Sequence, residues 1–257
     1  MNRNYYLLVF IFIVVSSVFI VSCNDDDAVK DSSVELGLCP DENHPHPIDL
    51  GIGVKFACCN VGAKNPFEDG YYYAWGETEG KKWYGNDNYQ FWDKDFYPLM
   101  DLPHDISNTT YDVATVKVGK TWRMPTLEEL HKLVDSCRYE WLTVHGVHGG
   151  KLTGPTGNSI FIPASGWIGE EIKNIYNYKY NYQGVYGYYR SSTLINDNGP
   201  ESIVVIGEPL PISPYYYYFN AVEAEGMFLA SDSIFIHPQG LTSGFPVRAV
   251  YLSSDSE

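Results

Sequence analysis

One segment of this chain has the periodicity of an amphipathic helix, and its isolation among short, aromatic-rich stretches is the strongest constraint on the fold. Thr126 and Glu129 have the spacing of a capping box, in which each side chain bonds the backbone amide of the other. Apolar residues then recur at helical spacing: Leu127, Leu130, Leu133, Val134 and Cys137. The pattern predicts a helix that begins after Thr126 and buries one face. A shorter helical turn is expected from Asp112.

The remaining patterns predict short strands. Alternating or aromatic runs of strand length occur at 47–57, 71–75, 151–153, 159–163, 187–193 and 244–250. Turn-forming residues at 154–158 separate two of these runs, whereas 80–110 is a long polar and aromatic stretch without a period. Because few helices accompany many short strands, we expect an α+β protein with antiparallel strands and long loops.

The N-terminus has the features of an export signal. Residues 5–22 form an uncharged apolar segment that is preceded by Arg3. The segment runs into the string IVSC, which ends at Cys23 and resembles the lipobox of bacterial lipoproteins, where the cysteine is lipidated. The acidic run at 24–27 resembles the signal that sends lipoproteins of Bacteroidota to the outer face of the outer membrane. We therefore expect a lipid anchor at Cys23; the alternative is an uncleaved signal anchor.

These features divide the chain into four parts. We expect a lipoprotein signal peptide at 1–22, an acidic flexible tether at 23–46, one domain at 47–252 and a short tail at 253–257. The protein would then lie outside the cell, attached to the outer membrane only through its lipid. The formal net charge of −15 argues against binding to nucleic acid or to anionic lipid, because both need clustered Lys and Arg.

Four cysteines remain beyond Cys23, an even number for an exported protein: Cys39, Cys58, Cys59 and Cys137. They allow three pairings, and adjacent Cys58 and Cys59 are poorly placed to bond each other. One of these two is expected to form a disulfide with Cys137 on the helix, and the other could attach the tether through Cys39. The alternative is that one pair is unbonded and buried. The cysteines lack the C-x-x-C spacing that is typical of metal sites, so metal binding by them is not expected.

Six strings occur in an order that resembles a known family. They are DLGIGVKFACCNVGA (49–63), YYYAWGET (71–78), DVATVKVGKTWRMPTLEEL (112–130), GNSIFIPASG (157–166), GYYRSST (187–193) and GFPVRAV (244–250). Together they resemble the Fibrobacter succinogenes major paralogous domain family of Bacteroidota, from about residue 46 onward. The resemblance implies a C-type lectin-like fold, related to the formylglycine-generating sulfatase-modifying group. It also implies a surface-exposed domain that acts in adhesion or ligand binding.

The chain departs from the pattern of that family in three places. The pair Cys58-Cys59 stands where the family usually has one cysteine. Arg190 replaces the tryptophan of the usual GYYWSST string, and the segment 194–214 is long and irregular. The last two departures fall where we expect the ligand-binding face.

Motifs for catalysis and for metal binding are absent from the sequence. No cysteine follows Cys137, so the reactive pair of a formylglycine-generating enzyme is missing. No complete calcium-dependent sugar motif of the classical lectin type occurs. His44 with His46, and His145 with His148, each lack an evident third ligand. We therefore expect no enzyme activity, no catalytic residue, no cofactor and no metal.

Three residues around the helix and the last string are expected to be structural. Trp122, together with Met124 and Pro125, precedes the capped helix and would anchor it to a sheet, and Arg123 is expected to be part of the scaffold. Arg248 lies in the final predicted strand, where we expect it to pair with a buried or half-buried acid.

Tyrosine, with 22 copies, supplies the candidate ligand surface. Its ring offers a large, rigid and amphipathic contact area at low entropy cost. The residues expected to bind ligand are Tyr186, Tyr188, Tyr189, Arg190, Tyr215, Tyr216, Tyr217 and Tyr218. The alternating tyrosines from 176 to 182 would share one face of a strand. Packing within the core is an equally weighted alternative for these rings.

The sequence thus favours a lipid-anchored cell-surface binding protein, an adhesin or ligand-recognition module that contacts a glycan or a protein through Tyr-rich C-terminal loops. Two alternatives stay open. The first is a structural or assembly component of the cell surface without a soluble ligand. The second is a receptor whose C-terminal face is diversified by a retroelement.

Overall fold

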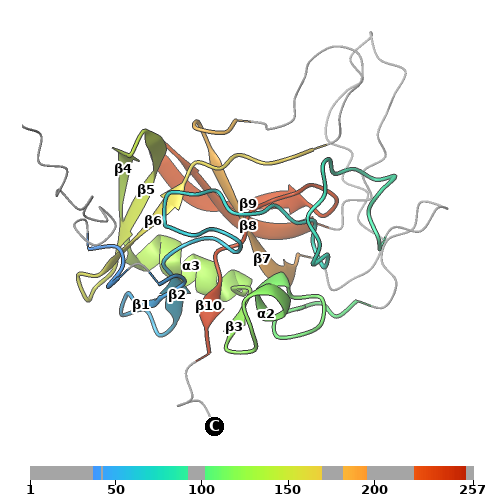
Figure 1. Cartoon of the computed structure of the whole chain (residues 1–257), viewed down its shortest axis with the longest axis horizontal. Helices are drawn as coiled ribbons and strands as arrows, with labels where there is room; N and C mark the ends of the chain where they lie inside the picture. Colours follow the sequence, from blue (N-terminus) through green and yellow to red (C-terminus); the bar gives the residue numbers. More distant parts are fainter. Residues whose placement is uncertain (1–36, 42, 92–101, 170–181, 196–222, 253–257) are drawn as a thin grey trace, which may run out of the picture. The chain divides into compact units, whose positions relative to one another are not determined.

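The computed structural model describes residues 37–41, 43–91, 102–169, 182–195 and 223–252. Within these ranges the chain forms three small antiparallel sheets, two helices and long connecting segments (Figure 1). This arrangement confirms the α+β class that the sequence predicts. No helix in these ranges is long and apolar enough to cross a membrane.

The first sheet joins strands that are far apart in the sequence. It contains β1 (Pro47–Asp49), β2 (Lys55–Ala57), β10 (Val250–Tyr251) and β3 (Trp122–Arg123), bonded in that order. The prediction of one continuous strand over 47–57 is wrong, because β1 and β2 pair with each other as a hairpin. Gly51 and Gly53 in the connection have left-handed backbone angles, which glycine adopts without steric cost.

The second sheet is a three-stranded meander. β4 (Arg138–Val144) pairs with β5 (Val147–Thr153), which pairs with β6 (Ser159–Pro163). The predicted turn at 154–158 separates β5 from β6. Every residue of β6 is buried, as its continuous apolar run suggests. The sequence patterns did not indicate β4, whose polar and aromatic residues are mostly half-buried.

The third sheet consists of β7 (Gly187–Leu194), β8 (Glu223–Ala230) and β9 (Ser233–Gly240). β7 pairs with β8, and β8 pairs with β9. The strand predicted at 187–193 is confirmed as β7. The hairpin of β8 and β9 was not predicted, although it forms two thirds of the sheet.

Both predicted helices are present and begin at the predicted caps. α3 (Leu127–Ser136) follows Thr126, whose hydroxyl accepts a hydrogen bond from Glu129 N at 3.3 Å. The Glu129 carboxylate in turn accepts one from Thr126 N at 2.9 Å, which completes the capping box. α2 (Val113–Lys117) follows Asp112, a buried carboxylate that accepts hydrogen bonds from amides of the first turn.

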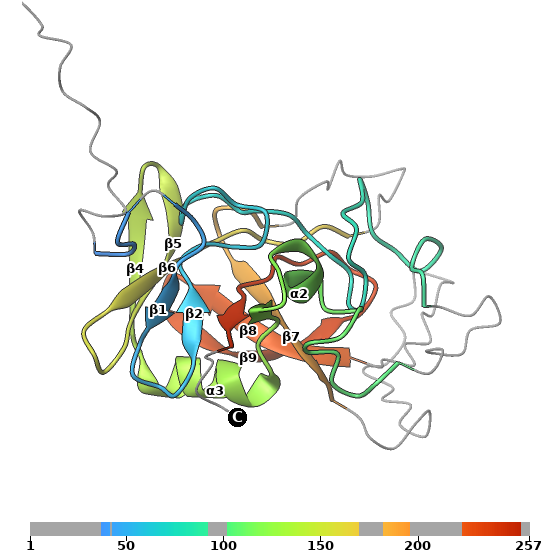
Figure 2. The ribbon, with the colours of Figure 1, turned by 60° about the horizontal axis from the view of Figure 1, so that its bottom comes forward.

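α3 packs against one face of the third sheet, which we call its inner face (Figure 2). Leu130 and Leu133 of the helix are buried in one hydrophobic cluster with Tyr189, Met227 and Leu229 of the sheet. Full burial of one leucine side chain contributes about 2 kcal/mol. The apolar stripe that was read from the sequence therefore fixes the helix to β7 and β8.

Four of the five residues in the aromatic run at 71–75 are buried core rather than a regular strand, and Tyr71 is exposed. Tyr73 forms an isolated bridge with Phe245, and its neighbours Tyr72 and Trp75 are also buried. The Tyr72 hydroxyl donates a hydrogen bond to a backbone carbonyl at 2.7 Å. Packing therefore uses these rings, which are unavailable to a ligand.

Arg248 is structural, but its partners are neutral. The buried guanidinium donates hydrogen bonds to Asn60 Oδ1 at 2.8 Å and to the carbonyl oxygens of Ala57 at 3.1 Å and Phe161 at 2.9 Å. The expectation of an acidic partner is wrong. Ala57 belongs to β2 and Phe161 to β6, so the two carbonyl oxygens come from different sheets. They replace the water that the guanidinium loses on burial.

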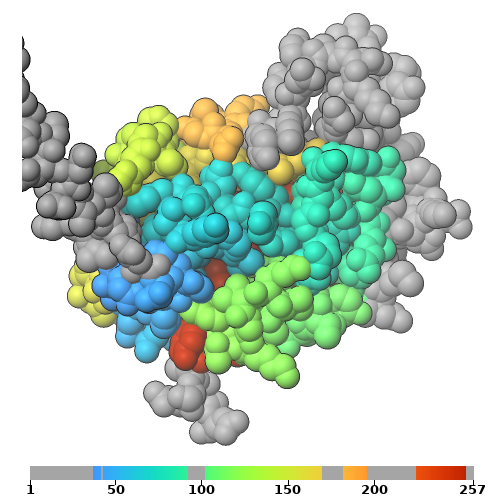
Figure 3. All heavy atoms as spheres, viewed as in Figure 1, coloured from blue at the N-terminus to red at the C-terminus, as the bar shows by residue number. Residues whose placement is uncertain are grey.

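The end of the segment expected to be a flexible tether is part of the folded domain from residue 37 onward. This stretch, which begins at residue 37, is the darkest blue part of Figure 3. Leu38 and Cys39 are buried in one hydrophobic cluster with Cys58 and Phe161. The tether prediction is wrong for this stretch, because burial of these side chains offsets the entropy lost when the chain is ordered. The rest of the predicted tether, 23–36, lies outside the described residues.

Candidate functional site

Part of the predicted set of site residues lies outside the described residues. This applies to the lipidation residue Cys23, to the tyrosines at 176, 178 and 180, and to Tyr215, Tyr216, Tyr217 and Tyr218. The structure describes the other four predicted ligand-binding residues: Tyr186, Tyr188, Tyr189 and Arg190. They lie in β7 or directly before it.

The outer face of the third sheet, opposite α3, carries a continuous row of aromatic rings. Tyr188, Phe228 and Phe235 are cross-strand partners on β7, β8 and β9. Their ring centroids are 5.1 Å apart for Tyr188 and Phe228, and 4.8 Å apart for Phe228 and Phe235. Tyr186 lies 5.3 Å from Phe228, and His237 lies 6.2 Å from Phe235. We call these five residues the aromatic face.

The aromatic face is open to solvent along β9. Phe235 is 41% exposed, and His237 is also exposed. Tyr186, Tyr188 and Phe228 are half-buried. Rings that contact one another at about 5 Å in tilted geometries are held in place by their neighbours. The row can therefore offer pre-organised flat surfaces to a sugar ring or to apolar side chains of a protein.

Tyr189 lies on the inner face and is a core residue. Its hydroxyl donates a hydrogen bond to the Pro163 carbonyl at 2.8 Å, accepts one from Asn60 Nδ2 at 3.1 Å and bonds Ser165 Oγ at 3.0 Å. Burial raises its pKa to about 12. The predicted ligand contact of Tyr189 is therefore corrected. Successive side chains of a strand point to opposite faces, so Tyr188 and Tyr189 cannot share one surface.

Arg190 is on the same side of β7 as Tyr188 but is buried. Its Nη2 donates hydrogen bonds to the carbonyls of Gly240 at 2.7 Å and Ser243 at 3.2 Å. The guanidinium also lies 4.5 Å from the centroid of the Phe245 ring. Burial lowers the pKa of the guanidinium. The predicted ligand contact is corrected, because Arg190 holds Phe245 and the chain after β9 in place.

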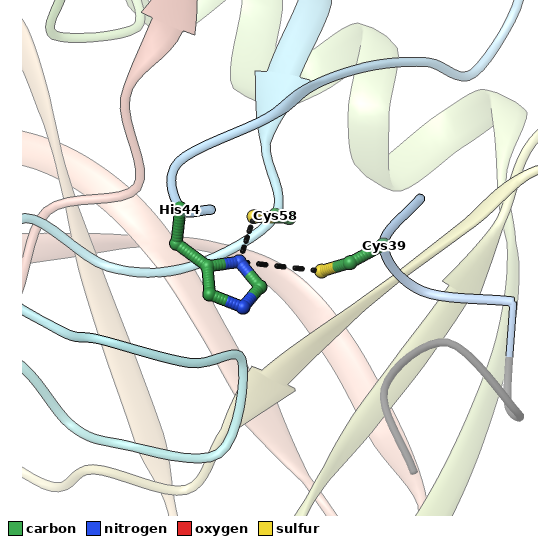
Figure 4. Close-up of side chains that lie close together, drawn as sticks. All are labelled: Cys39, His44 and Cys58. Atoms are coloured by element: carbon green, nitrogen blue, oxygen red, sulfur yellow. Dashed lines mark hydrogen bonds between the residues drawn. The ribbon is translucent and has the colours of Figure 1, made fainter. Parts of the chain in front are cut away.

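A second candidate site lies where the segment before β1 meets the end of β2. His44 Nδ1 is 3.1 Å from the sulfur of Cys58 and 3.6 Å from the sulfur of Cys39 (Figure 4). All three atoms lie within 4.8 Å of one another. In the part of the chain that the structure describes, this is the one group of three side chains with the donor atoms and spacing of a metal site. We call it the Cys–His cluster.

His46 borders the Cys–His cluster without joining it. Its backbone N–H donates a hydrogen bond to the Cys58 sulfur at 3.1 Å, and its carbonyl accepts one from Cys58 N at 2.9 Å. Its ring Nε2 lies 3.1 Å from a carboxylate oxygen of Asp41. The backbone of His46 therefore fixes the position of the Cys58 sulfur, while its ring is used elsewhere.

The sulfur of Cys58 is stabilised as a thiolate. Hydrogen bonding from the Cys39 thiol, followed by that from Cys59 and from the His46 amide, holds the pKa of Cys58 well below its usual range. The pKa of the neighbouring Cys59 thiol shifts in the opposite direction. Its hydrogen bond to Cys58 and its burial raise the pKa of Cys59. The adjacent cysteines therefore differ in their acid–base chemistry, and both sulfurs are buried.

The structure contains no disulfide among the four cysteines it describes. Cys137 follows the last residue of α3 and packs in the cluster between the helix and the third sheet. Cys58 and Cys59 belong to a different cluster, around Phe161. The predicted bond from this pair to Cys137 is therefore wrong. Burial raises the pKa of Cys137 to about 11, so it is a thiol at neutral pH.

Both sites include residues that the sequence patterns did not indicate. For the aromatic face these residues are Phe228, Phe235 and His237, and the available signal was a pair of short apolar runs, at 227–230 and 234–236, separated by a polar turn. For the Cys–His cluster, the sequence patterns did not connect the histidine to the cysteines. The two cysteines are 19 positions apart in the sequence, a spacing that carries no motif.

No family model, no curated protein and no solved structure matches this chain.

The two sites differ in the chemistry they can support. The aromatic face has exposed rings, which suits non-covalent binding of a flat or apolar surface. The Cys–His cluster offers two sulfurs and one imidazole nitrogen at short range, which suits a soft metal ion or thiol chemistry. The first site is open to solvent, whereas Cys39 and Cys58 of the second are buried.

Proposed function

We propose that this chain is a lipid-anchored protein of the outer cell surface, with Cys23 as the lipidated residue, and that its domain binds a glycan or protein ligand through the aromatic face. One observation carries the proposal. Five aromatic side chains are ordered by cross-strand contacts on the face opposite α3, and Phe235 and His237 are exposed. Contiguous exposed apolar surface marks interaction sites in soluble domains.

The fold belongs to the same proposal. The ordered strings that resemble the Fibrobacter succinogenes major paralogous domain family support a C-type lectin-like fold for residues 47–252. The antiparallel α+β organisation is compatible with this assignment. In this proposal the domain is a binding module without enzyme activity.

The charge of the chain narrows the class of ligand. With a net charge of −15, the protein repels anionic partners at long range. A neutral glycan or a basic protein surface is therefore favoured over an anionic polymer. Stacking on the aromatic rings would supply most of the affinity.

A glycan and host-matrix array probed with the full-length chain in mild detergent tests the proposal. We expect Phe235→Ala and Tyr188→Ala each to weaken binding about tenfold or more, because loss of a central aromatic contact costs on the order of 2 kcal/mol. Tyr71→Ala is the matched control, since Tyr71 is 62% exposed and lies outside the aromatic face. It should bind as the wild type does.

Two results would contradict the proposal. Equal losses in Tyr71→Ala and Phe235→Ala would mean that the aromatic face has no special role. No binding by a folded sample that instead co-purifies with a stoichiometric partner would favour an assembly component of the cell surface.

A further inference from the structure

We propose that Cys39, His44 and Cys58 form a binding site for a borderline-soft transition-metal ion, and that Zn²⁺ is the ion that fits the donor set best. The Cys–His cluster shares no residue with the aromatic face. The proposal therefore stands or falls independently of the proposed function.

The distances within the cluster are close to those of a metal coordination shell. Bonds of about 2.3 Å from zinc to sulfur and about 2.0 Å from zinc to nitrogen place adjacent donors roughly 3.5–3.8 Å apart in tetrahedral geometry. His44 Nδ1 lies 3.1 Å and 3.6 Å from the sulfurs of Cys58 and Cys39, and no two of the three atoms are more than 4.8 Å apart. Small side-chain shifts would let one ion contact all three.

The donor types select the class of ion. Two sulfurs and an imidazole nitrogen suit zinc or monovalent copper, whereas calcium and magnesium require oxygen donors. The His46 N–H that donates to the Cys58 sulfur is the kind of second-layer bond that orients a coordinating thiolate. Three protein ligands leave a fourth position for water or an added ligand.

The surroundings favour a metal over a disulfide. In a disulfide the sulfurs of Cys39 and Cys58 would bond at about 2.05 Å, and the imidazole would have no part in the link. Here His44 Nδ1 is within hydrogen-bonding reach of both sulfurs (Figure 4). The apolar side chains of Leu38 and Phe161 pack in the same cluster as the cysteines and shield the sulfurs from water.

A metal ion at this place would join two separate parts of the chain. Cys39 and His44 come from the stretch before β1, and Cys58 directly follows β2. Metal binding would therefore hold the stretch before β1 against the end of β2. The free energy of metal binding would add to that of folding, because the unfolded chain holds no such arrangement of donors.

Cobalt titration of the full-length chain tests the proposal. The protein is purified in mild detergent, reduced with a phosphine and freed of metal, and Co²⁺ serves as the spectroscopic substitute for Zn²⁺. We expect one ion per chain, thiolate-to-cobalt charge-transfer absorption, and its loss when Zn²⁺ displaces Co²⁺.

Variants identify the ligands. Cys39→Ser and Cys58→Ser should each weaken the charge-transfer band, and His44→Ala should abolish stoichiometric binding. Cys137→Ser is the matched control, because it removes a half-buried thiol outside the cluster and should bind Co²⁺ as the wild type does. Near-ultraviolet circular dichroism checks that each variant is folded. The titration of the wild type tests the proposal even where a variant fails to fold.

Three outcomes would overturn the proposal. The first is no thiolate-to-cobalt band in the reduced, folded wild type. The second is an unchanged band in Cys58→Ser. The third is a Cys39–Cys58 disulfide without metal in protein isolated from an oxidising compartment, as mass spectrometry would show; zinc bound to two intact thiols in that sample would support the proposal.

Discussion

At the scale of single residues, the two faces of β7 place neighbouring side chains in different environments. Tyr188 contributes its ring to the aromatic face, whereas Tyr189 sends its hydroxyl into a buried network with Pro163, Asn60 and Ser165. Buried polar groups need partners, because an unsatisfied one costs about 1–3 kcal/mol. The Tyr189 hydroxyl therefore holds β7 to the end of β6 and to the segment that follows β2.

Tyr189→Phe should lower the free energy of unfolding by about 1–3 kcal/mol at neutral pH, because Pro163 and Asn60 each lose a partner. Denaturant unfolding of the full-length chain measures this. Tyr182→Phe is the control, since Tyr182 is 56% exposed and should change stability little. A Tyr189→Phe protein as stable as the wild type would show that the network is not needed.

The same residue predicts how stability depends on alkaline pH. Burial raises the pKa of Tyr189 and of Tyr84 to about 12, above the ordinary value of about 10. Since the folded state prefers the protonated phenol, this stabilisation is complete below about pH 10 and is lost as the pH rises toward about 12. In that window the free energy of unfolding of the wild type should fall by roughly 1.4 kcal/mol more per pH unit than that of Tyr189→Phe. Denaturant unfolding of both proteins at several pH values measures the difference.

At the scale of elements, the start of α3 is tied both to its own cap and to β3. The Glu129 carboxylate bonds Thr126 N and also receives two hydrogen bonds from the Arg123 guanidinium, at 2.6 and 2.7 Å. This hydrogen bonding raises the pKa of Arg123, so the guanidinium stays charged. The capping box thus starts the helix and also positions it relative to the first sheet.

Thr126→Ala should destabilise the protein by about 1 kcal/mol, because the amide of Glu129 loses its capping oxygen. Thermal unfolding followed by circular dichroism measures the change. Lys132→Ala on the exposed side of α3 serves as the comparison and should stay within about 0.5 kcal/mol of the wild type. Equal effects of the two substitutions would count against a stabilising cap.

At the scale of the whole molecule, the domain begins earlier than residue 47. Leu38 is 1% exposed and packs in a cluster with Val144 of β4 and Phe161 of β6. The stretch from residue 37 therefore contributes to the core and brings Cys39 and His44 to Cys58. A domain truncated at residue 47 would lose two of the three donors of the Cys–His cluster.

Leu38→Ala should lower the free energy of unfolding by about 2–4 kcal/mol, which is the usual cost of deleting a buried leucine side chain. Pro40→Ala, at an exposed position two residues away, should have little effect. Chemical denaturation of both full-length variants provides the comparison. If the stretch were a flexible tether, Leu38→Ala would be as stable as the wild type.

The sequence by itself determined the local features of this protein. The capping residues Thr126 and Asp112, the apolar stripe of α3 and the turn at 154–158 depend on neighbours within one or two turns of chain, so their patterns are readable. The α+β class follows from the same local signals. The cysteine pairing and the tether depended on distant contacts, and the sequence predictions for both needed correction.

Only the tertiary structure decided which side chains meet. The pairing of β7, β8 and β9 placed Tyr188 beside Phe228 and Phe235, and put Tyr189 in the core. Packing of the stretch before β1 brought the Cys–His cluster together. These contacts join residues that no periodic pattern connects. Their energy comes from burial that exists only once the sheets and α3 have assembled.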